Sequence, residues 1–188
     1  MRSLVGIAFL FALLLTPGLS RDIAARQEST PPAGSDATPE TCPATTEEEN
    51  IAIARVWHEE VINQRNPAAL PAILAPEVVH HAAGGYPDTM TAGEVGGMMD
   101  DFLVAFPDLH YAFDLWITQD DYVVERYTAT GTQEGQLGQL APSGRTAIWT
   151  GVNIFRIECG RIAEVWSEVD ALSRTAQLSG EAAATPAP

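Results

Sequence analysis

The pattern of hydrophobic and polar positions predicts helices in the first half of the chain. Hydrophobic residues recur at helical spacing over residues 53–61. Thr46 or the threonine before it can cap this helix, with three glutamates in the first turn. A short second helix is expected over residues 67–74, where proline takes the first helical position. Thr91 caps a third helix, whose hydrophobic positions recur every three or four residues until Pro107 ends it.

The second half has the pattern of strands. Runs rich in β-branched and aromatic residues predict a short strand before the third helix and then three or four antiparallel strands. These runs cover residues 77–81, 109–118, 122–132, 146–157 and 161–169. Residues 133–144 contain three glycines and a proline and are too long for a tight turn, so we expect a mobile loop at the rim of the sheet.

The last two strands form a predicted hairpin around Glu158, Cys159 and Gly160. Because side chains alternate along a strand, each run divides into two faces, and neither run has a purely polar face. Such strands belong to a strongly curved sheet whose inner face lines a pocket or is covered by helices. Helices followed by a meander predict an α+β fold, a curved antiparallel sheet packed on N-terminal helices.

The two ends of the chain have the composition of non-domain segments. Arg2 precedes an apolar run over residues 4–15, too short to span a bilayer and typical of a cleaved signal peptide over residues 1–20. An uncleaved anchor is the alternative. Residues 21–46 and 181–188 lack large apolar side chains, so we expect a disordered tether and a disordered tail. This leaves a domain over residues 47–180 in a secreted or extracytoplasmic protein.

The charge excludes several classes of partner. The chain has 25 acidic residues and 10 basic ones, all arginine, and a net charge of −15. Losing Arg2 with the signal peptide makes this 9 − 25 = −16. Nucleic acids and anionic membrane surfaces need a basic footprint, so neither is an expected partner. A metal site is not expected either, because the four histidines and two cysteines lack the spacing of ligand sets.

The two cysteines are far apart in the sequence. An exported chain meets oxidising conditions, so Cys42 and Cys159 are candidates for a disulfide. Two free thiols, or pairing with another chain, remain the alternatives.

Several short motifs follow one another in a recognisable order. They are FPDL at residues 106–109, GTQEG at 131–135, PSGR at 142–145 and FRI-x-x-GRI-x-E-x-W at 155–166. In this order they resemble the SnoaL-like polyketide cyclase (ester cyclase) family, of the nuclear transport factor 2-like superfamily, over about residues 47–180. The resemblance implies a cone-shaped fold, with the curved antiparallel sheet packed on the N-terminal helices. It also implies closure of a ring by intramolecular aldol chemistry without metal or cofactor, in a mostly apolar pocket. It also implies a homodimer.

The resemblance also implies positions for the acid and base, and this chain departs from both. The family's aspartate after the tryptophan of the last strand is Ser167 here, and its pocket histidine is Asn153. Asp170 matches a second aspartate of the family, and His81 matches a histidine that follows the first strand. We therefore expect Asp170 and His81 to be the catalytic pair if the domain is an enzyme. A helix N-cap is the alternative role for Asp170.

The other candidate residues are expected to line the pocket. His80 and His81 face opposite sides of a strand, so only one of them points inward. Arg126 and Thr128 share a face, and an inward Arg126 needs a buried acid or an anionic ligand as its partner. If two aspartates flanked Arg126, the set would resemble that of a related family of the same fold, which activates water for epoxide hydrolysis. The pocket residues expected are His80, Arg126, Thr128, Trp149, Asn153, Phe155, Trp166 and Ser167.

These residues predict a pocket for a small, mostly apolar organic molecule. Two classes of function are compatible with it. One is a cofactor-free cyclase, isomerase or hydrolase. The other is a non-catalytic binding module, which the serine at the catalytic position favours.

Overall fold

The computed structural model describes residue 42 and residues 44–82 and 87–181. The expected signal peptide, most of the tether and all but the first residue of the tail lie outside the described residues. Among the residues described, no helix is both long enough and apolar enough to cross a membrane.

The N-terminal helices begin where predicted, but the geometry of the first two differs. The second, predicted as one helix over residues 67–74, is a 3-10 turn followed by a short α-helix that ends at Ile73. The first helix, α1, is capped by Thr46, whose hydroxyl accepts from the amide of Glu49 while the Glu49 carboxylate accepts from the Thr46 amide. It continues without a break into a π-helix, η1. Thr91 forms the same capping box with Glu94 at the start of α3. The segments are α1 Glu47–Arg55, η1 Val56–Asn63, η2 Pro67–Ala69, α2 Leu70–Ile73 and α3 Ala92–Ala105.

Within the described residues, six strands form one sheet in the order β2-β1-β6-β5-β4-β3. The strands are β1 Leu74–Ala82, β2 Thr89–Thr91, β3 His110–Gln119, β4 Tyr122–Thr132, β5 Thr146–Glu158 and β6 Arg161–Val169. The helix α4, Ala171–Ser179, follows β6 directly. The predicted α+β architecture is confirmed. Two details differ: β2 was not predicted, and β1 pairs with β6 in parallel, whereas every other pairing is antiparallel.

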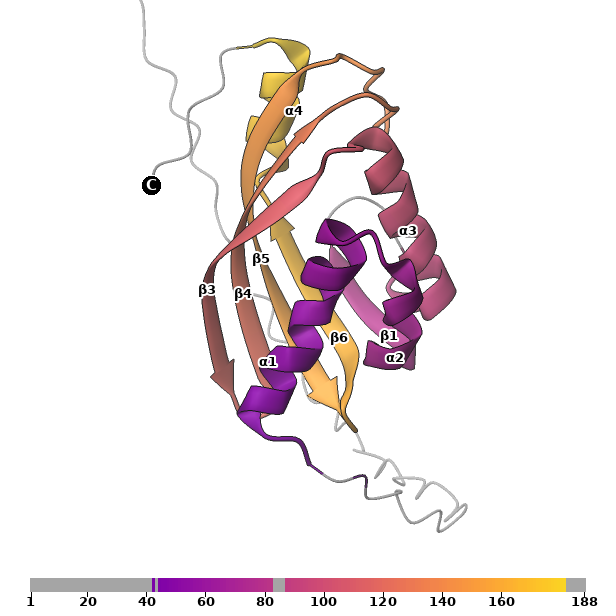
Figure 1. Ribbon diagram of the computed structural model, residues 1–188, viewed down its shortest axis with the longest axis vertical. Coiled ribbons are helices and arrows are strands. Elements are labelled where there is room, and N and C mark those ends of the chain that lie inside the picture. The colour runs from indigo at the N-terminus through magenta and orange to yellow at the C-terminus, as the bar shows by residue number, and fades with distance from the viewer. Residues whose placement is uncertain (1–41, 43, 83–86, 182–188) are drawn as a thin grey trace, which may run out of the picture. The chain divides into compact units, whose positions relative to one another are not determined.

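Helices α1, α2 and α3 cover one face of the curved sheet (Figure 1), and the core lies between these two layers. The side chains of β5 alternate between the two faces, with Trp149, Asn153 and Phe155 buried against the helices. In β4 the inward face holds Val123, Glu125, Tyr127 and Ala129. This arrangement is opposite to the predicted inward position of Arg126 and Thr128.

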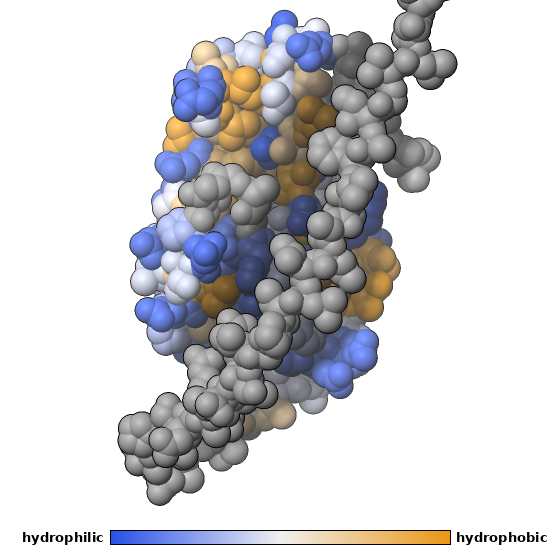
Figure 2. Space-filling model, turned by 180° about the vertical axis from the view of Figure 1, so that it is seen from behind, coloured by the Kyte–Doolittle hydropathy of each residue, from blue (hydrophilic) through white to orange (hydrophobic). Residues whose placement is uncertain are grey.

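The outer face of the sheet is mixed in character. Its side chains include the ion pair of Arg126 with Asp114, and the Thr128 hydroxyl donates to the same carboxylate. Exposed hydrophobic residues lie on this face as well, namely Leu115, Ile117, Tyr122 and Ile148. Figure 2, which shows the molecule from behind, has both hydrophobic and hydrophilic residues on the coloured surface.

The final hairpin closes in a tighter turn than predicted. Only Cys159 and Gly160 separate β5 from β6, and their φ angles are 55° and 69°. Two positive φ angles suit the type I′ turn, whose twist matches that of the strands. Cys159 forms a disulfide with Cys42, with their Cα atoms 5.2 Å apart. The disulfide joins the segment before α1 to the tip of the hairpin.

Candidate functional site

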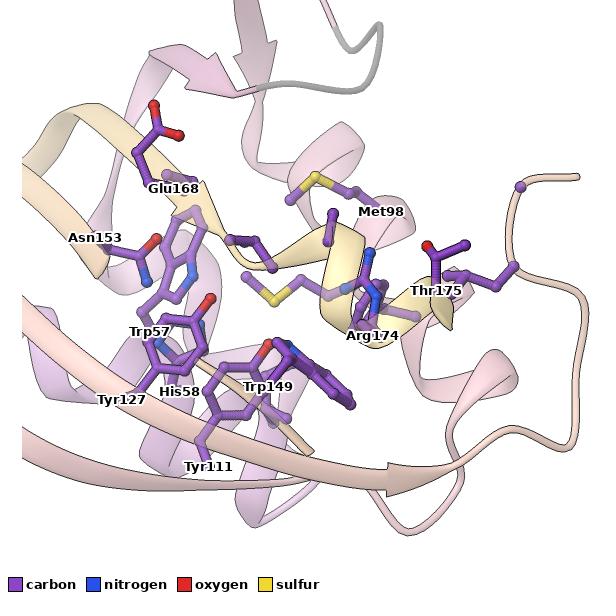
Figure 3. A pocket seen from close by; sticks show the side chains of 18 of the residues that line it. Trp57, His58, Met98, Tyr111, Tyr127, Trp149, Asn153, Glu168, Arg174 and Thr175 are labelled. Carbon is purple, nitrogen blue, oxygen red and sulfur yellow. The ribbon is translucent and has the colours of Figure 1, made fainter. Parts of the chain in front are cut away.

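A cavity of about 630 Å³ lies between the sheet and the helices, within the usual range for small-molecule sites. It is lined by residues of η1, α3 and α4, of the five strands β1, β3, β4, β5 and β6, and of the loop after β4 (Figure 3). Most of the lining is aromatic or aliphatic. The lining residues with polar or charged groups are His58, His80, Tyr111, Tyr127, Gln139, Trp149, Asn153, Ser167, Glu168, Arg174 and Thr175.

The π-helix η1 places two adjacent residues at the cavity. A π-helix makes i→i+5 hydrogen bonds and so changes the register that α1 had set. Trp57 and His58 are both buried and both line the cavity, and Val61 and Ile62 are buried one turn later. The sequence pattern predicted Trp57 and Val61 in the core but did not single out His58.

His58 faces a buried carboxylate. Its Nδ1 lies 2.7 Å from Oε1 of Glu125, at ion-pair distance but at an angle unsuited to a hydrogen bond. Asn153 donates to the same oxygen from its Nδ2, also at 2.7 Å. Glu125 is 0% exposed and His58 is 5% exposed, so both groups are shielded from bulk water. Because Nδ1 lies beside Glu125, Nε2 is the ring nitrogen left for a ligand.

The sheet register explains how these side chains meet. Glu125 of β4 lies opposite Asn153 of β5, which in turn lies opposite Ser167 of β6. Residues paired in this way point to the same face, so the three form one inward row. Ser167 and Asn153 occupy the positions where the family resemblance places an acid and a histidine. In this chain the carboxylate lies at the end of that row, and the imidazole comes from the helix above it.

Two tyrosines complete the wall around His58. The Tyr111 ring stacks on the imidazole at a centroid distance of 4.4 Å, and the Tyr127 ring lies 5.5 Å from it. Burial, chiefly, raises the pKa of both phenols above the ordinary value of 10.0. Both hydroxyls therefore stay protonated over the physiological range and can donate hydrogen bonds to an oxygen atom of a ligand.

The position of Tyr127 depends on its cross-strand partner, Gly151. A Cβ atom at Gly151 would lie 2.2 Å from the Tyr127 hydroxyl oxygen. Only glycine leaves room for the phenol to lie across β5 at this point.

Arg174 of α4 brings a positive charge to the cavity. Its guanidinium carbon lies 5.2 Å from the ring centroid of Phe102 and 5.3 Å from that of Trp149, which are cation–π distances. Trp149 is 0% exposed, and its indole N–H has no hydrogen-bond partner among the described residues.

Four of the eight predicted pocket residues line the cavity: His80, Trp149, Asn153 and Ser167. Of the two adjacent histidines, His80 is the buried one, and burial is the main cause that lowers its pKa. The other four are not among the lining residues. Phe155 packs behind the cavity against Trp57, with the ring centroids 5.7 Å apart.

Arg126, Thr128 and Trp166 belong to the outer face, because the alternation of β4 and β6 directs them away from the helices. Trp166 stacks there on His81 at a centroid distance of 4.9 Å. The pairing of Arg126 with Asp114 on this face does not bring an aspartate–arginine–aspartate set to the cavity.

Neither member of the expected catalytic pair lines the cavity. Asp170 is the N-cap of α4, and its carboxylate accepts from the amide of Ser173 at 3.0 Å. His81 is exposed, and its Nε2 donates to the Glu164 carboxylate at 2.7 Å. The prediction that they act together at one pocket is wrong in its geometry, because β1 directs His81 to the outer face while Asp170 belongs to a helix start.

Sequence reasoning did not select His58, Glu125 or Arg174. One signal for Glu125 was present: Val123, Tyr127 and Ala129 make its face of β4 the more apolar one. A glutamate on such a face must find partners, and that requirement identifies a polar cluster. Among the described residues, no group of three or more histidine, cysteine, aspartate or glutamate side chains is placed to hold a metal ion.

Comparison with known proteins identifies the family. A family model of SnoaL-like polyketide cyclases matches residues 52–178. The chain belongs to this family. No curated protein sequence matches it.

Solved structures agree with this SnoaL-like assignment at the level of the fold. AclR of Streptomyces galilaeus, provisionally described as a hydroxylase, is 22% identical, with a TM-score of 0.63 over 75% of this chain and 87% of that one. A provisionally named polyketide cyclase of Acidithiobacillus ferrooxidans is 19% identical (TM-score 0.64, 73% and 99% covered). TsrD of Streptomyces laurentii is 24% identical (TM-score 0.64, 71% and 97% covered). At these identities the likeness establishes the fold alone.

Proposed function

We propose that this SnoaL-like domain transfers protons on a small, mostly apolar carbonyl compound, with His58 as the general acid and base. The observation that carries the proposal is the buried contact of His58 with Glu125 at the cavity. A histidine held by a carboxylate, with its second nitrogen left for the substrate, is a recurrent arrangement of a catalytic base. Side chains alone suffice for this chemistry.

The proposed reaction begins at a carbon next to a carbonyl group. Nε2 of His58 takes the proton from that carbon, and the electron pair of the C–H bond forms an enolate. The phenols of Tyr111 and Tyr127 donate hydrogen bonds to the enolate oxygen. Glu125 faces the imidazolium that results and stabilises its charge. Returning the proton to another carbon is an isomerisation.

Ring closure uses the same groups. The enolate carbon attacks a second carbonyl carbon of the same molecule, and the alkoxide that forms takes the proton from the imidazolium. In both reactions Glu125 and Asn153 are positioning residues, because Glu125 acts through the His58 ring and Asn153 holds the Glu125 carboxylate.

The test is exchange of carbon-bound hydrogen in D2O, followed by NMR on a panel of 1,3-diketones and β-keto esters. H58Q should lower the exchange rate by about 10²-fold or more, the usual contribution of a general base. H81Q is the matched control, since His81 is exposed on the outer face, and it should exchange at the wild-type rate. An H58Q variant as fast as wild type, or an equal loss in H81Q, would refute the assignment of His58.

Glu125 needs a readout that a structural role would not change. E125Q keeps the size of the side chain and one acceptor oxygen for Asn153 but removes the charge. We expect slower exchange with an acidic limb of the pH–rate profile moved to lower pH. A lower exchange rate in E125Q with an unchanged pH–rate profile would show that Glu125 contributes only to packing.

Non-catalytic binding is the second function, favoured by the serine at position 167 in the inward row. A ligand that co-purifies with the protein and is identified by native mass spectrometry, combined with no exchange in the wild type, would establish it.

We further propose that the protein is exported. The disulfide between Cys42 and Cys159 supports this proposal, because disulfides persist chiefly in oxidising compartments. Mass spectrometry of the N-terminus of the protein recovered from its native host tests it.

A further inference from the structure

We propose that the cavity selects aromatic carboxylic acids, and that Arg174 and the indole N–H of Trp149 bind the carboxylate. The inference rests on the proposed function for the place of the ligand in the molecule, and it adds the chemical class. It concerns the side of the cavity formed by α4, away from His58.

Arg174 supplies the charge for this site. Its guanidinium group lies over the rings of Phe102 and Trp149, and these rings hold its planar fork at the cavity wall. A guanidinium group binds a carboxylate through two parallel hydrogen bonds, a geometry that lysine cannot supply. The electrostatic influence of Arg174 reaches both cavity tyrosines, where it opposes the rise in pKa that burial causes.

Trp149 supplies a second donor. The indole nitrogen can only donate, and in the described part of the chain it meets no acceptor although the residue is fully buried. A buried donor without a partner costs free energy that a ligand oxygen would recover. The ring that carries this N–H is the one on which Arg174 lies, so an oxygen at this wall meets a charged donor and a neutral donor.

The rest of the cavity indicates the body of the ligand. Figure 3 shows Arg174 and Thr175 on one side of the cavity and Trp57, His58 and Asn153 on the other. Aromatic and methionine side chains form much of the cavity wall, including Met98, Met99 and Phe102. These surfaces favour an apolar, planar group. A bound acid would direct its carboxylate to α4 and its body toward His58.

The charge of the chain sharpens this selectivity. The protein has a net charge of −15 and therefore repels anions at long range. The exposed Glu168 at the cavity adds to this repulsion. An anion binds inside only if a specific cation compensates, and Arg174 is the one arginine among the lining residues of the described chain.

The experiment measures binding of paired probes by calorimetry. The probes are benzoic, 2-naphthoic and anthracene-2-carboxylic acid, each against its primary amide, which has nearly the same shape but no charge. None of them has an exchangeable C–H next to a carbonyl, so the result does not depend on the proposed reaction. At least one acid should bind more tightly than its amide to the wild type, by about tenfold, the scale of a charge-assisted pair.

R174Q and R174M should abolish this preference, and circular dichroism verifies that each variant folds. R126Q is the matched control, because it removes the same charge from the outer face. It should retain the preference. W149F keeps an aromatic ring near the guanidinium but removes the N–H together with one of the two fused rings, and it should weaken binding of the acid several-fold.

The inference fails if no acid of the panel binds more tightly than its amide. It also fails if the preference survives in both Arg174 variants, or if R126Q removes it equally. An unchanged affinity of W149F for the acid would exclude the indole N–H from the site. Failure of the exchange test with a retained preference would refute the proposed reaction but leave this binding site in place.

Discussion

Loss of the Cys42–Cys159 disulfide should destabilise the domain strongly. The two residues are 117 positions apart in the sequence. For a loop of this length, the chain-entropy relation gives about 16 cal/mol/K of entropy removed from the unfolded chain. At 25 °C this amounts to about 5 kcal/mol, an upper value because the unfolded chain is more compact than a random coil. A domain of this size loses about 2–4 °C in Tm for each kcal/mol, so the melting temperature should fall by roughly 10–20 °C at most.

The assay compares thermal unfolding with and without reductant, and C42S serves as the engineered equivalent. Cys42 is the better position to change, because Cys159 lies in a turn with a φ of 55°. Reductant should lower the Tm of the wild type and leave that of C42S unchanged. Two free thiols per chain in the non-reduced exported protein would refute the reasoning, as would a wild-type Tm that does not respond to complete reduction.

Three further changes test other parts of the structure. G151A should destabilise the domain by about 1–3 kcal/mol in urea unfolding, because the added Cβ collides with the Tyr127 hydroxyl; a gain in stability would contradict the contact. The pKa of Glu164 is lowered from its ordinary value of 4.5, chiefly by the hydrogen bond from Arg156 and to a smaller extent by the one from His81. The stabilisation from this carboxylate is therefore present above about pH 4.5 and lost as the pH falls below it. E164Q should flatten the decline of Tm between pH 6 and 3, and an equally steep decline would refute the linkage. If the exposed outer face forms the expected homodimer, I117E should convert it to a monomer by light scattering, and a dimeric I117E would place the interface elsewhere.

The sequence by itself determined the class of fold and most of its elements. The capping threonines, Thr46 and Thr91, begin α1 and α3 where predicted, because capping is a local interaction within one turn. The strand pattern located the hairpin of β5 and β6, and the order of short motifs identified the family. The strand pattern also predicted that Asn153 and Trp149 line the cavity, since alternation along β5 assigns them to one face.

The tertiary structure alone decided which polar groups meet. Periodicity divides β4 into two faces that each contain a charged residue. The Glu125 face is the more apolar one and is the inner face, but the groups that Glu125 and Arg126 meet lie on other segments and cannot be read from β4 alone. A hydrophobic pattern with a period of 3.6 residues likewise does not predict that α1 continues as the π-helix η1. This change of geometry brings His58 to the cavity. Pairing His58 with Glu125 depends on how a helix packs on a sheet, an interaction between segments far apart in the chain. Local sequence does not encode that packing, and for this reason the acid–base cluster emerged only from the fold.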